Sequence, residues 1–434
     1  MAKELEKSVI TCDLEGRIET FGDGSERMFG YTKDEVIGKK RVSVFSPGQV
    51  VLEHIPKWLG IASKQGEFTT QTVFLRKNGE PFAAKIRITP TSKNNVQVGY
   101  CGVTEELPNV APKDAMPKIS LMTKIFTWLV ITRAPFLTAI ILPILIGAAW
   151  VATLDPASPF PTGKFFLTLF AGIFLNVTAN AFNDYFDWTS GTDQRNNDYF
   201  LPYSGGSRSI ELGLVNEKSL FAVGSFSLLA SAVLGLILAQ QSGWGVLVFG
   251  LVGAFCAFFY TAPPLRLAAR RGLGELVVGL NCGPLAVAGT VYALTGKVTL
   301  VDFLAGVPIG LLTIAILWIN QFPDEEADKA SGKLNLVVTL GKAKARWGYV
   351  LLLVAAFGLA LYWSLVSGIF PLGALLILGS APLAIKACAV TMREYRERSL
   401  VCANVATIQL QALAGVLMAA GILWSESISR MLGI

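Results

Sequence analysis

The sequence predicts a small α+β domain followed by an all-α polytopic membrane domain of nine transmembrane helices. The chain of 434 residues is 52% hydrophobic and only 16% charged, a composition far from that of an average soluble protein. Residues 1–107 have ordinary polarity, whereas the chain after Ile119 consists of long apolar stretches separated by short charged loops. We therefore expect domains at 1–107 and 119–434, joined by a linker over 108–118.

The N-terminal region combines strand-like and helical patterns. Alternating runs in SVITCDLEGRIETF and NNVQVGYCGVTEEL predict strands. In YTKDEVIGKK, Thr32 and Glu35 have the spacing of a capping box, in which each side chain satisfies a free amide at the start of a helix. Between two further strand-like runs, Asn78 and Gly79 favour the positive φ angles of a tight hairpin turn. These features predict a small sheet with short helices.

After the N-terminal domain, the sequence predicts a linker and then a series of transmembrane helices. The proline-rich PNVAPKDAMPK is expected to hold the two domains apart. A hydrocarbon core about 30 Å thick needs about 20 apolar residues per helix. By this measure the predicted spans are 134–153, 164–187, 219–240, 243–262, 273–294, 301–321, 346–366, 369–390 and 400–424.

The six cysteines have no C-x-x-C pair or metal-like spacing, which argues against a disulfide framework and a zinc site.

The charges in the loops predict the orientation. Three loops on one side carry the basic residues Arg266, Arg270, Arg271, Lys342, Lys344, Arg346, Lys386, Arg393, Arg396 and Arg398. The opposite loops hold little more than Lys164 and Lys297. Basic loops stay in the cytoplasm, and the polar N-terminus MAKELEKSVI has no apolar core of a signal peptide. We expect a multi-pass protein of the cytoplasmic (inner) membrane, with its N-terminal domain and basic loops in the cytoplasm.

Paired carboxylates end two of the apolar stretches. Asp184 and Asp187 in NAFNDYFDWTSGTD share one helix face at a spacing of i and i+3, and Asp324 and Asp328 in LWINQFPDEEADKASGK do so at i and i+4. Two such faces opposed across a cavity repel each other strongly. A hard divalent cation, most plausibly Mg²⁺, would balance them and leave coordination sites for phosphate oxygens. The alternative is a set of solvated loop charges.

A glycine-rich loop supports an anionic ligand. In YSGGSRSIE, Gly205, Gly206 and Ser207 offer backbone amides that can turn toward an anion, and Arg208 adds a forked cationic donor. Such a loop alone is weak evidence. Beside paired acidic motifs it fits a diphosphate bound by both metal and protein.

The N-terminal segments GRI, ERMFGYTKDEVIGK and RKNGEPF, in this order, resemble a PAS domain over about 100 residues. The resemblance implies a sensor or interaction module, with a small ligand of the PAS domain left open. His54, the only histidine, is either a haem ligand or a solvated helix residue. Neither Cys12 nor Cys101 lies in the polar motif that covalent flavin chemistry needs, so we expect none.

The membrane region resembles the UbiA superfamily of intramembrane prenyltransferases over about 119–434. The resemblance rests on NDYFDWTSGTD, YTAPPLRLAARRGLGE and FPDEEADKASGKLNLVVTLG, which are similar to its cytoplasmic signature loops. It implies nine transmembrane helices, an isoprenyl diphosphate bound through Mg²⁺, and prenyl transfer to an acceptor that is often an aromatic ring. Carried over by position, Asn180, Asp184 and Asp187 match the first motif, and Asp324 and Asp328 match the second.

Details of the first motif indicate a branch of the superfamily. Many members have an acid four residues after the second aspartate, where this chain has Gly191, and here the acid follows at Asp193. This variant resembles the menaquinone branch, which prenylates 1,4-dihydroxy-2-naphthoate. Asn335 departs from the common GK-x-T-L pattern.

The resemblance also assigns roles within the site. We expect Mg²⁺, with Arg208, Lys333 and Arg133, to stabilise the departing diphosphate, so that the allylic C–O bond ionises and the electron-rich ring attacks. The apolar lumen would keep water from the cation. The metal ligands are expected to be Asp184, Asp187, Asp324 and Asp328, and the other substrate-binding residues Asn180, Asn183, Asp193 and Tyr260. For Tyr260, a role in packing alone is an equal alternative to substrate binding.

Other functions remain as alternatives. The acceptor could instead be 4-hydroxybenzoate or a lipid precursor. A PAS-containing membrane receptor has no use for paired acidic motifs. Charges at the membrane midplane would indicate a transporter. The acids of this sequence cluster instead at one face of the membrane. The expected partners are an isoprenyl diphosphate, an aromatic acceptor and the lipid bilayer, with no nucleic acid.

Overall fold

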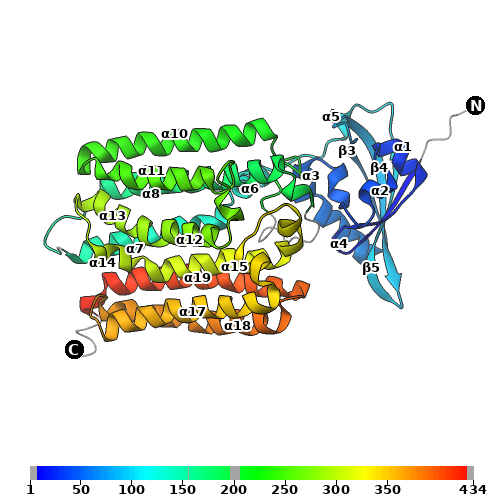
Figure 1. Ribbon diagram of the computed structural model, residues 1–434. Helices are drawn as coiled ribbons and strands as arrows, with labels where there is room; N and C mark the ends of the chain where they lie inside the picture. The colour runs from blue at the N-terminus through cyan, green and yellow to red at the C-terminus, as the bar shows by residue number, and fades with distance from the viewer. Residues whose placement is uncertain (1–6, 155, 196–205, 428–434) are drawn as a thin grey trace, which may run out of the picture. The chain divides into compact units, whose positions relative to one another are not determined.

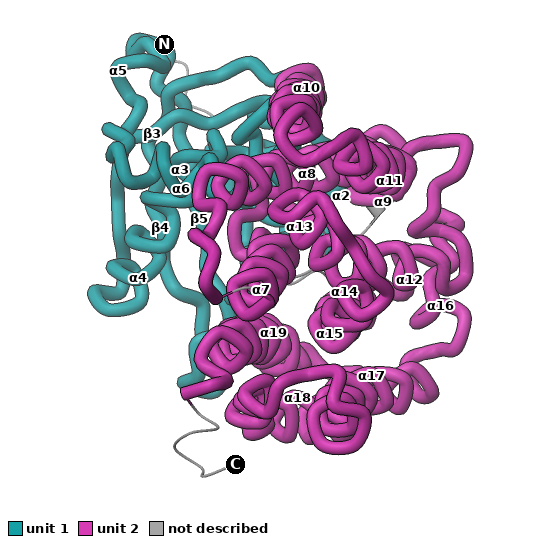
Figure 2. Tube along the Cα trace, turned by 90° about the vertical axis from the view of Figure 1, so that its left-hand side faces the viewer, with its two compact units in different colours: residues 1–131, 208–216 teal, residues 132–207, 217–434 magenta. Residues whose placement is uncertain are grey.

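The computed structural model describes residues 7–154, 156–195 and 206–427 (Figure 1). The chain forms two compact units, coloured separately in Figure 2. Unit 1 comprises residues 1–131 and 208–216, and unit 2 comprises 132–207 and 217–434. The first unit therefore extends past the predicted boundary at 107 and also takes in a short segment from within the predicted membrane domain.

Unit 1 is built on a five-stranded antiparallel sheet with strand order β2-β1-β5-β4-β3 (Figure 1). The strands are β1 (Lys7–Asp13), β2 (Ile18–Phe21), β3 (Phe68–Leu75), β4 (Pro81–Lys93) and β5 (Val96–Glu106). The helices are α1 (Asp23–Phe29), α2 (Lys33–Val36), α3 (Gly48–Glu53), α4 (Ile55–Gln65), α5 (Pro112–Ala115) and α6 (Leu121–Ile131), with a short 3-10 turn over Val42–Phe45. The predicted α+β character of this region is confirmed.

Two local predictions have different outcomes. The capping box forms as predicted, since the Thr32 amide donates to Glu35 Oε2 at 3.0 Å at the start of α2. The hairpin turn between β3 and β4 forms, but only Gly79 has a positive φ, of +82°. Asn78 instead accepts a hydrogen bond from the Glu80 amide at 3.0 Å, so it stabilises the turn through its side chain rather than through a left-handed backbone.

The sheet of unit 1 buries aromatic side chains against α1. Phe29 of α1 lies among Phe45, Phe74 and Phe82, with ring centroids 4.3 to 5.7 Å apart. Such contacts stabilise a core beyond the area they bury. The predicted linker is partly folded onto this sheet, because Ala115 of α5 is buried in a cluster with residues of β3 and β4. A proline at the first turn of α5 suits a helix start, where its missing amide costs nothing.

Helix α3 is joined to α6 through a carboxylate. Glu53 Oε2 accepts hydrogen bonds from the Ser120 amide at 2.9 Å and from Thr123 Oγ1 at 2.7 Å. The hydrogen bonds from Thr123 and Ser120 lower the pKa of Glu53 to about 2, so the carboxylate is charged when it caps α6. Next to it, His54 Nε2 lies 3.2 Å from the Lys118 carbonyl oxygen. His54 is partly exposed and lies at the junction between α3 and α4 rather than inside one long helix.

The described residues of unit 2 form helices joined by loops, with one isolated β-bridge between Arg270 and Leu334. Eight of its helices or helix pairs there are long and apolar enough to span a membrane: Ala134–Leu154, Thr162–Thr189, Glu217–Ser242, Leu273–Thr295, Leu300–Ala330, Lys342–Leu365, Leu372–Glu394 and Arg398–Leu423. Each coincides with a predicted span. The remaining predicted span, 243–262, is α11 (Gly245–Phe259), a helix of 15 residues. It is shorter than predicted because Pro263 and Pro264 follow closely and proline cannot continue a helix.

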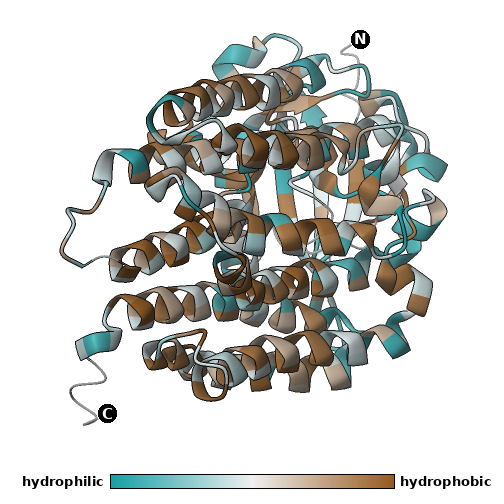
Figure 3. Cartoon of the chain, turned by 60° about the vertical axis from the view of Figure 1, so that its left-hand side comes forward, coloured by the Kyte–Doolittle hydropathy of each residue, from teal (hydrophilic) through white to brown (hydrophobic). Residues whose placement is uncertain are grey.

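The helices enclose an apolar core and expose apolar faces. Buried contacts join α7 (Thr138–Leu154), α15 (Val307–Ala330), α17 (Lys342–Leu365) and α19 (Val401–Leu423). Within this core the Tyr349 hydroxyl lies 2.6 Å from Thr407 Oγ1. Hydrophobic residues also cover outward-facing turns (Figure 3), among them Phe226, Leu251, Leu351 and Ile385. Unit 2 is therefore a multi-span membrane domain, whose outer apolar faces suit lipid.

Candidate active site

The two predicted acidic motifs lie in the last turns of two long helices. Asp184 and Asp187 are buried near the end of α8 (Thr162–Thr189). Asp324 and Asp328 lie at the corresponding end of α15, and Asp328 is also buried. Carboxylates at such positions need a positive partner, because transferring an unpaired charge out of water is costly.

Lys333 lies between the two motifs. Its Nζ is 3.3 Å from Asp187 Oδ2 of α8 and 3.9 Å from Asp328 Oδ1 of α15. Burial lowers the pKa of Lys333, but the carboxylates of Asp187 and Asp328 raise it by more, so the ammonium is held protonated. One cation thus bridges two helices whose acidic ends would otherwise repel each other.

Arg133 is the second cation of the site. Its guanidinium donates through Nη2 to Asp184 Oδ1 and, at 3.1 Å, to Asn183 Oδ1, while Nε donates to Asp184 Oδ2 at 3.3 Å. The backbone of Arg133 is left-handed, with φ of +51°, which costs a residue with a side chain about 1–2 kcal/mol. The bonds to Asp184 and Asn183 offset that cost.

The glycine-rich loop contacts the first motif through its backbone. The Ser207 amide donates to Asp184 Oδ1 at 3.3 Å. Gly206 has φ of +80°, and a Cβ there would lie 2.9 Å from Asp184 Oδ1, so this position favours glycine. Gly205 lies outside the described residues. Arg208 belongs to unit 1, where its Nη1 donates to Glu211 Oε2 at 2.9 Å.

These polar groups stand at one end of a chamber of about 780 Å³ inside unit 2. Its polar end is lined by Arg133, Asn183, Asp187, Asp193, Gly206, Asp324, Asp328 and Lys333. Its walls continue along apolar side chains of α8, α10 (Glu217–Ser242), α11 and α13 (Ala286–Thr295), as far as Thr168, Leu238 and Ala293. The chamber is therefore a mainly apolar cavity that ends in a charged cluster, a form typical of ligand sites.

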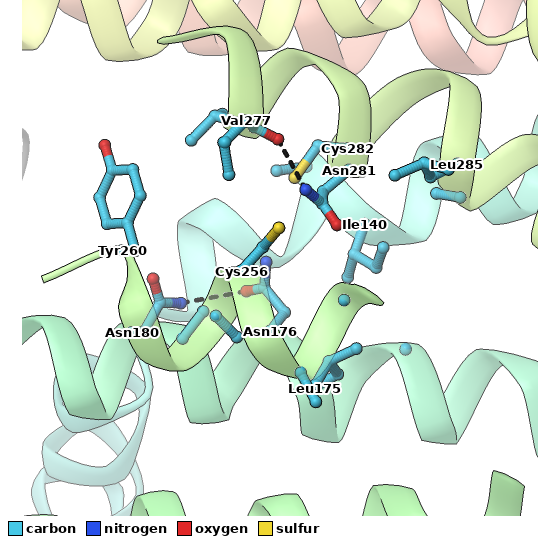
Figure 4. Close-up of a pocket in the computed structure, with 18 of the residues that line it drawn as sticks. Ile140, Leu175, Asn176, Asn180, Cys256, Tyr260, Val277, Asn281, Cys282 and Leu285 are labelled. Carbon is cyan, nitrogen blue, oxygen red and sulfur yellow. Dashed lines mark hydrogen bonds between the residues drawn. The ribbon is translucent and has the colours of Figure 1, made fainter. Parts of the chain in front are cut away.

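Further predicted residues also line the chamber (Figure 4). Asn180 donates to Asn176 Oδ1 at 3.0 Å and faces the chamber together with Tyr260. Asn281 lies in a π-helical turn, Asn281–Leu285, and donates to the Val277 carbonyl at 2.8 Å. All the predicted site residues that the structure describes line this chamber, except Asp184, Ser207 and Arg208. Asp184 is bonded to Arg133, which does line it. Asn176 and Asn281 were missed, although polar side chains within apolar spans are a recognisable signal of function.

Asn335 is a supporting residue whose role the sequence did not reveal. Its Nδ2 donates to Asp328 Oδ2 at 2.7 Å, and its Oδ1 accepts from the Val338 amide at 2.9 Å as the N-cap of α16 (Leu336–Leu340). Asn335, the residue that departs from the common motif, therefore fixes the orientation of Asp328 through this hydrogen bond. Asparagine before a short apolar run was the available signal.

Glu275 is a second such residue. This buried carboxylate, in α12 (Leu273–Leu280), accepts hydrogen bonds through Oε1 from Gln321 Nε2 at 3.0 Å and from the Leu336 amide at 2.9 Å. Gln321 lines the chamber one turn before Asp324. Glu275 consequently ties the chamber wall to the loop that carries Lys333 and Asn335.

The donor set suits a magnesium ion bound together with a ligand. Within the described ranges, no three acidic, histidine or cysteine side chains converge into a complete metal cage. Mg²⁺ is usually held by one or two carboxylates plus substrate phosphates rather than by the protein alone. The oxygen donors offered by the two acidic motifs fit that mode of binding.

Fold and site together define an integral membrane protein with an apolar chamber that ends in paired carboxylates and two cations, Arg133 and Lys333. The model of the UbiA prenyltransferase family matches residues 140–408, and the chain belongs to this family. It is therefore a transferase. A model of the PAS domain matches residues 6–105, in agreement with the sheet of unit 1.

Relatives of known function match the membrane region. The chain is 27% identical over 303 residues to 1,4-dihydroxy-2-naphthoate octaprenyltransferase of Bacillus subtilis, covering 68% of this chain and 91% of that protein. It is 29% identical over 306 residues to 2-carboxy-1,4-naphthoquinone phytyltransferase of Synechocystis, covering 69% and 93%. The apo structure of a UbiA homologue from Aeropyrum pernix is similar with a TM-score of 0.50 and 18% identity, covering 68% of this chain and 98% of that one. This similarity confirms the fold.

The first prediction concerns the cap of α16. Replacing Asn335 by alanine removes an N-cap, which costs about 1 kcal/mol, so the Val338 amide should exchange with deuterium roughly fivefold faster. Asn335→Ser should keep nearly normal exchange, because a serine hydroxyl can cap the helix although it is too short to reach Asp328. Hydrogen exchange of the full chain in lipid measures both. Equal rates in the alanine variant and the parent would contradict the capping role.

Proposed function

We propose that this protein transfers a prenyl chain from an isoprenyl diphosphate to an aromatic acceptor, 1,4-dihydroxy-2-naphthoate, in menaquinone biosynthesis. The observation that carries the proposal is Lys333, placed between carboxylates of two helices at the mouth of an apolar chamber. A diphosphate needs the charged end and a prenyl chain needs the apolar walls. The naphthoate activities of the two relatives favour this acceptor.

The residues of the chamber explain how transfer would proceed. Lys333 and Arg133 are placed to donate to the leaving diphosphate as the allylic C–O bond breaks and its electron pair passes to oxygen. Magnesium bound at the acidic motifs supplies further electrostatic stabilisation of that leaving group. The apolar walls exclude water from the carbocation. The ring of the acceptor then forms the new carbon–carbon bond, and the attacked ring carbon releases the group it carried, as a proton or, from a carboxylated carbon, as carbon dioxide.

The acidic motifs should be required for transfer. Asp184→Asn, Asp187→Asn, Asp324→Asn and Asp328→Asn should each lower magnesium-dependent transfer by about 10²-fold or more, since losing one preorganised electrostatic contact typically costs that much. Assays in lipid vesicles with a long-chain prenyl diphosphate measure the rate. Glu326→Gln is the matched control, because this exposed carboxylate lies on the same helix and should leave the rate unchanged. Normal turnover in all four variants would refute the site.

The acceptor can be tested directly. In the same vesicles, 1,4-dihydroxy-2-naphthoate should be prenylated in preference to 4-hydroxybenzoate when both are supplied at equal concentration. Mass spectrometry of the extracted lipids identifies the product. A strong preference for the benzoate would show that the acceptor assignment is wrong while leaving the prenyl transfer itself intact.

We further propose that the acidic ends of α8 and α15 and the PAS domain face the cytoplasm. The distribution of basic loops supports this orientation. A single tag in the 262–272 loop should be inaccessible to a membrane-impermeant reagent in intact cells, whereas a tag in the 155–163 loop should react. The reverse pattern would overturn the orientation.

A further inference from the structure

Helix α3 of the PAS domain makes contacts at both of its ends with segments that lead along the chain to Asp184. Its N-terminal residue, Gly48, meets the segment 208–216, and its C-terminal residue, Glu53, meets the start of α6. All of these contacts lie within unit 1. The inference drawn from them rests on the proposed function, because it concerns the carboxylate that would help bind the diphosphate.

The N-terminal contact is a backbone-to-backbone approach. A Cβ at Gly48 would lie 2.1 Å from the Leu212 carbonyl oxygen and 2.6 Å from Leu214 Cδ2. The segment is itself compact, since the Leu212 amide donates to the Arg208 carbonyl at 2.8 Å and the Leu214 amide donates to the Ser209 carbonyl at 2.9 Å. No residue with a side chain fits at position 48 unless the segment moves.

The segment continues directly into the backbone that holds Asp184. Ser207, next to Arg208 in the chain, donates its amide to Asp184 Oδ1 at 3.3 Å. Gly206 approaches the same oxygen so closely that a Cβ would lie 2.9 Å from it. Hence only one or two peptide units separate the turn docked on α3 from the carboxylate. If that turn moves, the one or two peptide units between it and Asp184 leave little backbone that could compensate for the movement.

The C-terminal contact leads to the other partner of Asp184. Glu53 caps the first turn of α6 through Ser120 and Thr123. Helix α6 ends at Ile131, and two residues later Arg133 binds Asp184. One short helix of the PAS domain therefore contacts both of the chain segments that lead to the partners of this carboxylate.

We propose that α3 is a positioning element for the first acidic motif, with Gly48 and Glu53 as positioning residues. Through 208–216 and α6, the helix sets the places of the Ser207 amide and the Arg133 guanidinium around Asp184. A change in the packing of α3 thereby alters the affinity of the site for the prenyl diphosphate. Couplings of this kind typically change affinity about 5- to 150-fold.

The test uses the full chain in lipid vesicles with Gly48→Ala. The matched control is Gly60→Ala in helix α4, where a Cβ meets nothing within 4 Å. Gly48→Ala should raise the KM for the prenyl diphosphate roughly fivefold or more, with little change in the KM for the aromatic acceptor. A merely destabilised protein would lose active enzyme and lower the apparent kcat without changing one KM selectively. Equal KM values in the two variants would overturn the proposal.

Hydrogen exchange gives a readout that does not depend on catalysis. In Gly48→Ala the Ser207 amide should lose protection, while it stays protected in Gly60→Ala and in the parent. Unchanged protection would overturn the positioning role even if transfer were not observed. Absence of magnesium-dependent transfer in the parent protein would instead refute the proposed function, so the two failures are distinguishable.

Glu53→Ala tests the other end of the helix and serves if Gly48→Ala fails to fold. It should raise the same KM, whereas Glu53→Gln, which keeps an accepting oxygen, should recover part of the effect. Glu67→Ala is the control, because this glutamate is an exposed residue of the same unit. A normal KM in Glu53→Ala with faster exchange at the Ser120 amide, which Glu53 accepts from, would refute the coupling through α6.

Discussion

The ion-pair bridge from Lys333 to Asp187 and Asp328 is the interaction on which the site depends. It brings together the acidic ends of two long helices, α8 and α15, that repulsion would otherwise separate. Arg133 forms an ion pair with Asp184 of α8. Arg133 and Lys333 thus offset part of the negative charge at this end of the chamber, and the same two cations are also suited to a diphosphate. The same side chains therefore stabilise the structure and are placed to bind the ligand.

A second layer of contacts holds these charges in place. Asn335 orients Asp328 while capping α16, and Glu275 joins the chamber wall at Gln321 to the loop that carries the bridging lysine. Supporting hydrogen bonds of this kind commonly affect metal affinity and activity as strongly as 10- to 100-fold. Their positions are set by three different helices and a loop, so they act only when the bundle is assembled.

The PAS domain adds a feature that a prenyltransferase chamber does not itself require. Its helix α3 is fixed both to the segment 208–216 and to α6, and each of these continues to a partner of Asp184. A sensor domain can affect a distant site only through a structural element whose position influences both the domain and the site. Here that element is short and its contact at Gly48 involves backbone atoms, which allow little adjustment.

The sequence by itself determined the two domain types, the apolar spans and the four aspartates, because each depends on local composition, periodicity or spacing. It also indicated Arg133, Asn180, Tyr260 and Lys333 through the family resemblance. Only the tertiary structure decided that Lys333 bridges both motifs, that Asn335 and Glu275 support them, and that Arg208 pairs with Glu211. It likewise placed 208–216 with the PAS domain. The Lys333–Asp187 bridge and the contacts of Glu275 join residues far apart in the chain, and such contacts depend on how the helices pack rather than on any local pattern.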